Sequence, residues 1–253
     1  MVEPPHEPHQ EPADGQVGVV GALWRYPVKS MAGQELASTG LSSQGLHGDR
    51  THAVLDAVDG EVASAKDTRR WPRLFEFTAA CLGTPGAGAP SPVRITLPGG
   101  ETLLSGQHDA SDVLSRAMDR PARLTSSAER FFDDVPVHVV TTATLQHLHE
   151  LHPPGEMAVR RFRPNIVVET PATVRGFAEN DWVDRTLRVG DDVALAVVGP
   201  CPRCVMVTLA QPGLPRDRGV LRTAARHNDA NVGVYARVLS GGQVHRGDRV
   251  RLE

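Results

Sequence analysis

Short runs of apolar residues recur along the chain, and glycine, proline or aspartate separates most of them. The first run starts at Val17 and ends at Tyr26-Pro27, where proline stops a strand from continuing inside a sheet. Further runs follow at close intervals, with Asp59-Gly60 and Gly99-Gly100 as hairpin turns. The expected strands are His52–Asp56, Glu61–Ser64, Leu74–Ala80, Val93–Leu97 and Glu101–Leu104. This rhythm predicts a β meander or a small barrel.

The second half opens with a β run at Val137 that passes into a helix with Leu145, Leu148 and Leu151 on one face. Strands are then expected at Asn165–Glu169, Thr186–Val189, Val193–Val198, Val205–Leu209, Val232–Leu239 and Asp248–Leu252. Shorter helices are expected at Ala110–Met118 and Gly219–Ala225. Because strands outnumber helices and do not alternate with long ones, we predict a mostly β protein with some helix (α+β), built around barrels.

The Pro, Glu and His residues of segment 1–16 have little to bury, so we expect a mobile tail there. Segment 131–137 carries little pattern beyond a proline. We therefore divide the rest of the chain into a first domain over residues 17–134 and a second over residues 135–253.

Composition narrows the classes of function. The 253 residues are 40% hydrophobic and 23% charged, which is ordinary for a globular chain, and the net charge of −3 gives no electrostatic case for nucleic acid. Three cysteines form neither a secreted disulfide framework nor the four-thiolate ligand set of an ordinary iron–sulfur cluster. No apolar run is long enough for a membrane span and no signal-peptide pattern precedes it, so we expect a cytoplasmic protein.

The tetrapeptide Cys201-Pro202-Arg203-Cys204 is open to four interpretations. It is a dithiol redox pair, half of a zinc site completed by distant histidines, two buried small hydrophobic residues, or the source of one thiolate for a soft redox metal. The strand pattern expected after it weakens the thioredoxin-like interpretation. The residues alone do not choose among the others.

Three basic clusters have the side chains that bind phosphate or carboxylate oxygens. The segment 160–166 holds three arginines followed by Asn165, and Lys29-Ser30 lies where the first strand ends. Asp49-Arg50 precedes the next strand. The sequence contains neither the glycine-rich motifs of nicotinamide-binding and P-loop proteins nor the nucleophile elbow of serine hydrolases. It therefore does not indicate any of these three classes.

A series of motifs in order along the chain resembles the MOSC superfamily with its N-terminal β-barrel domain. These motifs are LWRYPVKSMAG, GLHGDR, RFRPNIVVE, LRVGD after a tryptophan, CPRCVMVTL, NVGVYARV and GDRVRL. Members of that superfamily include the mitochondrial amidoxime-reducing component of animals and its bacterial counterparts. The resemblance covers the chain from Val17 to Glu253 and leaves out only the tail.

The resemblance implies a molybdenum ion held by a pterin dithiolene, with Cys204 as the protein ligand of the metal and as the catalytic cysteine. It implies that Cys201 packs or lies behind the ligand. The residues that match the family's cofactor contacts are Lys29, Ser30, Arg50, Thr141, Thr142, Arg163, Asn165 and Arg203. At the level of the superfamily it also implies an association with pyridoxal phosphate.

The reaction implied is the two-electron reduction of an N-hydroxylated small molecule, such as an amidoxime, a hydroxylamine or an N-hydroxylated base. The electrons are expected from a separate partner, a flavin reductase or a ferredoxin, and we expect a monomer in the bacterial cytoplasm without membrane or nucleic-acid partners. Met31 replaces a cysteine that many relatives carry after the Lys-Ser pair. A different class of function stays open, in which the chain binds the cofactor or carries sulfur without this turnover.

Overall fold

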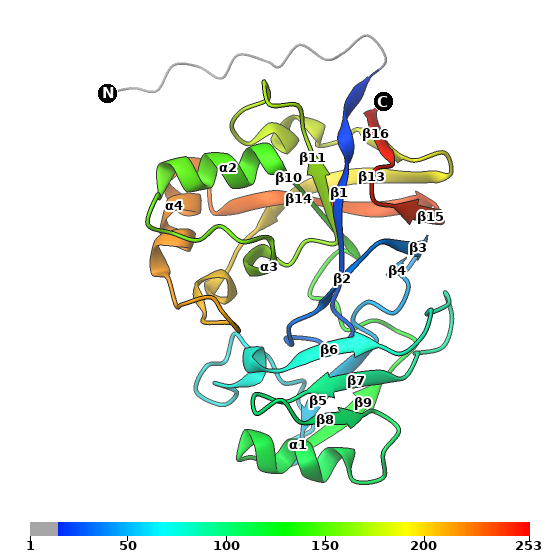
Figure 1. Ribbon diagram of the computed structural model, residues 1–253, viewed down its shortest axis with the longest axis vertical. Helices are drawn as coiled ribbons and strands as arrows, with labels where there is room; N and C mark the ends of the chain where they lie inside the picture. Colours follow the sequence, from blue (N-terminus) through cyan, green and yellow to red (C-terminus); the bar gives the residue numbers. More distant parts are fainter. Residues whose placement is uncertain (1–14) are drawn as a thin grey trace.

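The computed structural model describes residues 15–253, so the predicted tail lies almost entirely outside the described residues. Seven strands close into a barrel, which occupies the upper half of Figure 1. Its order is β11 (Ile166–Glu169), β10 (Val137–Thr141), β14 (Asn231–Ser240), β13 (Val193–Pro202), β12 (Thr186–Val189), β16 (Arg249–Leu252) and β1 (Gln16–Arg25). The ring closes because β1 pairs with β11, and the short β2 (Gln34–Leu36) extends it beside β1. The mostly β class predicted from the sequence is confirmed.

The first strand of the chain completes the barrel of the second half. Strand β1 runs antiparallel to β11 on one side and to β16 on the other. Gly18 allows this close pairing, because a Cβ at that position would lie 2.3 Å from the carbonyl oxygen of Glu169. The second half of the chain therefore forms its barrel only with a strand from the first half, and the proposed division at residue 134 separates segments that pair.

The barrel interior is filled with apolar side chains. Strands that line it alternate between the interior and the outside, as β12 and the centre of β1 do. The buried residues of this core are Val20, Leu23, Leu41, Leu46, Val137, Val139, Ile166, Val168, Trp182, Leu187, Val189, Val193, Leu195, Val197, Val234, Ala236, Val244, Val250 and Leu252. This core holds the strand ends of the barrel in fixed positions.

The rest of the first half forms the lower part of Figure 1 around a separate core. Its elements are β5 (His52–Asp56) paired with β9 (Ala122–Ser126), a sheet of β6 (Thr78–Cys81), β7 (Val93–Thr96) and β8 (Thr102–Leu104), and helix α1 (Ala110–Met118). A third small sheet joins β3 (Ser38–Ser42), β4 (Gly45–Leu46) and β15 (Gly242–His245). Strand β15 comes from the end of the chain, so it ties the two halves together a second time.

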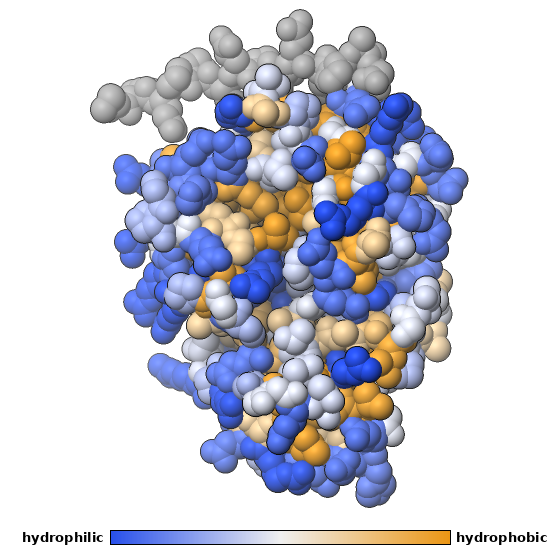
Figure 2. Space-filling model, viewed as in Figure 1, coloured by the Kyte–Doolittle hydropathy of each residue, from blue (hydrophilic) through white to orange (hydrophobic). Residues whose placement is uncertain are grey.

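Two helices cover the outside of the barrel over a third core. Helix α2 (Thr142–Leu151) packs against helix α4 (Arg218–Asn228), and the one-turn helix α3 (Val159–Phe162) lies below them in Figure 1. Thr141 begins α2, because its hydroxyl accepts a hydrogen bond from the amide of Thr144. On the face drawn in Figure 2, hydrophilic residues dominate the outline and apolar residues show through in the middle of both halves.

Three predicted strands differ from the structure. Residues Val205–Thr208 form a 3₁₀ helix, η3, because the chain turns sharply at Cys204 and the amide of Val207 bonds back to its carbonyl. The expected strand Leu74–Ala80 begins with a 3₁₀ turn, η1 (Leu74–Glu76), and only its end belongs to β6. In Glu61–Ser64 the ladder is a single bridge between Val62 and Leu55. Each segment buries part of its apolar residues, such as Leu74, Ala63 and Val207, without forming the expected full strand.

Within residues 15–253, no helix has both the length and the apolar composition that crossing a membrane requires.

Candidate functional site

A cavity of about 380 Å³ lies between the two halves, at the barrel end where β1 ends and β10 and β11 begin. We call it the basic cavity. The first half contributes Lys29, Ser30, Arg50 and Lys66, and the connecting segment 131–135 covers one side. The second half contributes His138, Arg163, Asn165, Pro202, Arg203, Cys204, Met206 and Tyr235. Side chains from three separate parts of the sequence therefore face one space.

Seven of the nine predicted site residues line this cavity. They are Lys29, Ser30, Arg50, Arg163, Asn165, Arg203 and Cys204. Each lies just beyond or before a barrel strand or at the start of β5, so closure of the barrel brings them to the same end. Sequence reasoning missed Lys66, Asp133, His138 and Tyr235, which also line it.

Thr141 and Thr142 do not line the cavity. They lie at the opposite end of β10 from His138. The Thr141 hydroxyl donates to the buried Glu179 carboxylate at 2.6 Å, and Thr142 shares a hydrogen bond with Thr170. Burial raises the pKa of the Glu179 carboxyl. These threonines begin helix α2 and hydrogen-bond to segments that follow β11.

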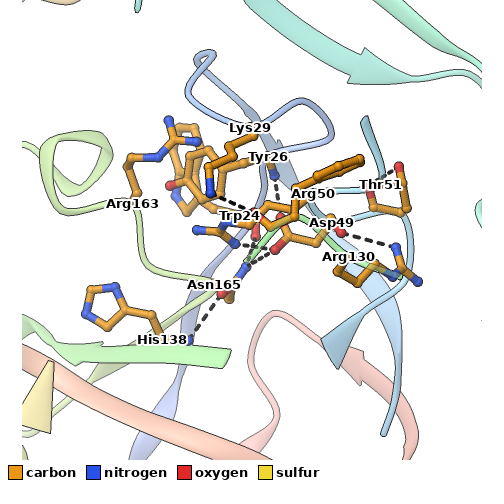
Figure 3. Close-up of polar contacts among 12 residues, drawn as sticks. Trp24, Tyr26, Lys29, Asp49, Arg50, Thr51, Arg130, His138, Arg163 and Asn165 are labelled. Carbon is orange, nitrogen blue, oxygen red and sulfur yellow. Dashed lines mark hydrogen bonds and ion pairs between the residues drawn. The ribbon is translucent and has the colours of Figure 1, made fainter. Parts of the chain in front are cut away.

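The carboxylate of Asp49 contacts Arg50 and Asn165, two residues that line the basic cavity (Figure 3). It is fully buried and accepts hydrogen bonds from the amide of Tyr26 at 2.6 Å and from the side-chain amide of Asn165 at 3.2 Å. It also forms an ion pair with Arg50. Because a buried carboxylate is costly unless its oxygens are paired, Asp49 fixes the orientation of both neighbours toward the cavity.

The guanidinium groups of Arg50 and Arg163 stack on the ring of Tyr26, at 5.2 Å and 4.1 Å from its centroid. Arg163 also donates to the carbonyl oxygen of Met31 at 2.6 Å. Burial lowers the pKa of Arg163 to about 10, so it stays charged near neutral pH. The Tyr26 hydroxyl is buried without a hydrogen-bond partner among the described residues. The stack holds two positive charges together beside the cavity, which favours an anionic ligand.

Three residues of the cavity wall have left-handed backbone conformations. Ser30, Arg50 and Arg163 have φ angles of 64°, 49° and 55°. Residues other than glycine adopt this region at a cost of roughly 1–2 kcal/mol, and such positions concentrate at binding sites. The conformation turns the chain sharply after β1, before β5 and before β11. Packing around these turns keeps the strain in place.

Asp133 joins two lysines at the cavity. Its carboxylate accepts from Lys29 Nζ at 2.5 Å and from Lys66 Nζ at 2.6 Å. Burial on its own would raise the pKa of Asp133, but the hydrogen bonds from both lysines bring it down to about 2. The carboxylate therefore occupies the place where another anion would contact the same ammonium groups.

The two cysteines of the CPRC motif have different surroundings. Cys201 is fully buried at the end of β13, and the guanidinium of Arg203 donates to its sulfur. Cys204 is partly exposed, lies at the start of η3 and lines the cavity. All three cysteines of the chain are free. Only the second thiol of the motif is therefore presented to a ligand in the basic cavity.

Arg203 precedes Cys204 in the chain and contacts the one-turn helix α3. Its Nη2 donates to the carbonyl oxygen of Phe162 at 2.8 Å, while its Nε is buried without a partner among the described residues. An orphaned buried donor costs about 1–3 kcal/mol, and an acceptor arriving in the cavity would relieve that cost. The arrangement suits an anion placed beside the Cys204 thiol.

Two further titratable groups of the cavity stay neutral near pH 7. His138 Nε2 donates to the carbonyl oxygen of Val232 at 2.9 Å, and burial, followed by the charge of Arg203, lowers its pKa to about 3. Burial and the neighbouring Cys201 thiol raise the pKa of Tyr235. Neither side chain therefore adds charge to the cavity near neutral pH.

The donor set fits a phosphate-bearing cofactor with a soft metal. Five cationic side chains line the cavity, namely Lys29, Arg50, Lys66, Arg163 and Arg203, and they exceed its two carboxylates, Asp133 and Asp134. A volume of about 380 Å³ falls within the range of small-molecule pockets, roughly 300–1,000 Å³. Within residues 15–253, no three His, Cys, Asp or Glu side chains lie close enough to hold a metal by themselves. Cys204 would thus act as a single protein ligand, and the zinc interpretation lacks its further ligands in the described part of the chain.

Comparison with known proteins gives the following matches. The family model described as the MOSC domain matches residues 126–251, and the MOSC N-terminal beta barrel domain matches residues 17–135. Mitochondrial amidoxime reducing component 2 of Rattus norvegicus is 28% identical over 235 residues, with 77% of this chain and 67% of that protein covered. Mitochondrial amidoxime-reducing component 1 of Homo sapiens is 24% identical over 232 residues, with the same coverage of 77% and 67%.

A shorter match joins 31% of this chain to 9% of molybdenum cofactor sulfurase 3 of Aedes aegypti, at 39% identity over 79 residues. Among solved structures, the YUAD protein from Bacillus subtilis superposes with a TM-score of 0.52 at 11% identity, covering 93% of this chain and 95% of that one. At that identity the structural match bears on the fold alone.

Proposed function

Because this chain belongs to the MOSC domain family and carries its N-terminal beta barrel domain, we propose that it is a molybdenum-cofactor-dependent oxidoreductase that reduces N-hydroxylated compounds. The observation that carries the proposal is the position of the Cys204 thiol in one cavity with five cationic side chains. Relatives named amidoxime-reducing components support the substrate class, which comprises amidoximes, hydroxylamines and N-hydroxylated bases.

When bound, the molybdenum–pterin group supplies the two-electron chemistry. Cys204 would provide the thiolate ligand of the metal, a soft donor for a redox metal. Lys29, Arg50 and Arg163 would bind the anionic phosphate of the pterin, with Asn165 and the Ser30 segment orienting it. Arg203 would place a charged donor beside the ligating sulfur.

The chain's own residues would also shape the approach of substrate. The segment 131–135 covers one side of the basic cavity, where it would limit the entry of water. Tyr235 lines the cavity with a hydroxyl whose raised pKa keeps it neutral, and it would hold a proton there. Lys66 lines the same cavity as Cys204 and would add positive charge beside the ligand.

Electrons would arrive from a separate partner, a flavin reductase or a ferredoxin. The expectation of a monomer in the bacterial cytoplasm and the superfamily-level link to pyridoxal phosphate stay predictions.

A second candidate function is the binding of the molybdenum cofactor, or the carriage of sulfur on Cys204, without this turnover. The match to a molybdenum cofactor sulfurase favours it, and that match is restricted to 79 residues. The dithiol interpretation is less favoured, because Cys201 is fully buried against Arg203.

The test is to produce the protein with a molybdenum supply, measure molybdenum and pterin per chain, and assay an amidoxime with a chemical reductant. We expect bound molybdenum and reduction of the amidoxime. Molybdenum bound without reduction of any N-hydroxylated compound would favour the carrier function.

Matched cysteine variants locate the ligand. Cys204→Ser should lose molybdenum and activity together, whereas Cys201→Ser should keep molybdenum. Equal retention in both variants would show that the ligand is misassigned, and loss of activity without loss of molybdenum in Cys201→Ser would support the dithiol function.

A further inference from the structure

A second cavity, of about 560 Å³, lies between the loop 65–76 of the first half and the segment 209–216 that leads into α4. We call it the aromatic cavity. Its walls include the rings of Trp71 and Phe75, with Leu209 and Pro212 on the opposite side. The guanidinium of Arg120 covers Trp71, 5.1 Å from the ring centroid, and fixes the plane of that ring. These walls suit a flat apolar body.

One buried donor in this cavity has no acceptor. Gln211 is 7% exposed, and its Nε2 is buried without a hydrogen-bond partner among the described residues. Its backbone is held by two hydrogen bonds with Leu214, of 3.0 Å and 2.8 Å, around a turn that contains Gly213 at a φ of 70°. The unsatisfied amide is therefore held in place at the cavity wall and does not relax into solvent.

A free positive charge lies on the same wall. Arg216 is exposed, lines the cavity, and makes no hydrogen bond or ion pair within residues 15–253. The acidic residue of the wall is Glu76, and its carboxylate already accepts from Arg73 Nε at 3.0 Å. The unused polar groups of the cavity are thus a buried amide donor and a guanidinium, which favour a ligand with oxygen acceptors and negative charge.

We propose that the aromatic cavity binds a planar aromatic carboxylate, with its ring between Trp71 and the Leu209 side and its carboxylate at Gln211 and Arg216. This goes beyond the proposed function, because the site shares no lining residue with the basic cavity. Two segments form a common wall. In the first segment, Ala65 lines the aromatic cavity and Lys66 lines the basic cavity. In the second segment, Leu209 lines the aromatic cavity and Met206, in η3, lines the basic cavity. A ligand in the aromatic cavity therefore packs against the segments that carry Lys66 and follow Cys204.

The test is isothermal titration of the metal-free full chain with 2-naphthoate, with 2-naphthamide as the uncharged analogue. We expect naphthoate to bind with a dissociation constant below about 1 mM and naphthamide to bind at least about tenfold more weakly. The indole N–H resonance of Trp71 should shift on addition of naphthoate. Absence of naphthoate binding, or equal binding of the amide, overturns the proposal.

Two arginine variants provide the matched control. Arg216→Ala should weaken naphthoate binding about fivefold to tenfold, whereas Arg218→Ala, two residues further and outside the cavity, should leave it unchanged. Gln211→Leu should weaken it severalfold, because the buried donor is lost. Equal effects of the two arginine variants would show nonspecific charge attraction and overturn the site.

A change in the basic cavity separates the two sites. Lys29→Ala should leave naphthoate binding intact. If it abolishes that binding, naphthoate occupies the basic cavity and the proposal fails. Because no molybdenum takes part, a negative result here leaves the proposed function untouched, and failure of the molybdenum assay leaves this site untouched.

Discussion

The barrel interior and the basic cavity at its end are built on the same barrel but differ in polarity, charge and backbone conformation. The interior is built from apolar side chains that β1, β10 and β14 direct inward. At the barrel end beside the cavity, Asp49, His138 and Asn165 are polar and buried. The interior stabilises the fold through apolar burial, whereas the cavity holds paired charges, orphaned donors and left-handed backbone that the fold must support. Stability and chemistry therefore occupy adjacent but separate regions of one barrel.

The largest effect on the side of stability is expected for Leu195→Ala. Leu195 is fully buried in the interior, and a closed barrel has little freedom to collapse around the space that the change creates. We expect a loss of about 4 kcal/mol of unfolding free energy, measured by urea denaturation. In the fraction that stays folded, affinity of the basic cavity for inorganic phosphate should be unchanged. A large loss of affinity would mean that the two regions are not separate.

The next effect is expected for Asp49→Asn, which keeps the shape of the side chain. The new amide group would meet the donors of Arg50, Asn165 or the Tyr26 amide, which now point at a carboxylate. We expect a loss of about 3 kcal/mol of unfolding free energy in urea together with at least about tenfold weaker phosphate binding. Here, unlike at Leu195, stability and binding should fall together.

The control for Asp49 is Asp59→Asn. Asp59 pairs with Arg70 near the surface, where its side chain is 42% exposed. Its removal should cost less than about 1 kcal/mol and leave phosphate binding intact. If Asp59→Asn cost as much as Asp49→Asn, the buried carboxylate would have no special part in the site.

A smaller, pH-dependent effect is expected from His138. Its pKa of about 3 lies below the unfolded value of about 6.5, so the unfolded chain binds the extra proton between these two values. Unfolding free energy should therefore be insensitive to His138 above about pH 6.5 and fall as pH decreases below it. From pH 6.5 to pH 5 the loss through His138 is about 2 kcal/mol. His138→Gln should remove that part of the slope, measured by urea denaturation at both pH values. The same slope in both proteins would contradict a neutral buried imidazole.

Much of the site could be predicted from sequence because its residues lie at strand ends. Lys29 follows β1, Arg163 and Asn165 precede β11, and Cys204 follows β13, so short motifs carried the information. The two threonines show where that reasoning stops. In the parallel pair β10 and β11, Val139 lies opposite Ile166 and Thr141 opposite Val168, so the strand direction carries Thr141 away from Asn165. That register depends on barrel closure, which local pattern does not encode.

Long-range contacts account for most of what the sequence did not predict. Asp133 meets Lys29 across 104 positions and Lys66 across 67, and neither pairing leaves a mark in the local sequence. The expected strand at Val205–Leu209 is absent for a different reason. Its β-branched residues favour a strand locally, but the turn that presents Cys204 to the cavity requires the compact 3₁₀ helix η3. Tertiary structure there overrides local preference.

The smallest effect is expected for Asp133→Asn, and it tests whether the cavity carries an internal competitor for anions. The Asp133 carboxylate, with a pKa of about 2, stays ionised at all ordinary pH values and occupies Lys29 and Lys66. Removal of its charge should strengthen phosphate binding about threefold to tenfold at low salt in isothermal titration. Asp134→Asn removes the same charge from the same wall, but Asp134 makes no ion pair within residues 15–253, so it should have a smaller effect. Equal gains from both variants would reflect the net charge of the cavity, whereas a gain confined to Asp133 would identify it as the residue that an incoming anion displaces.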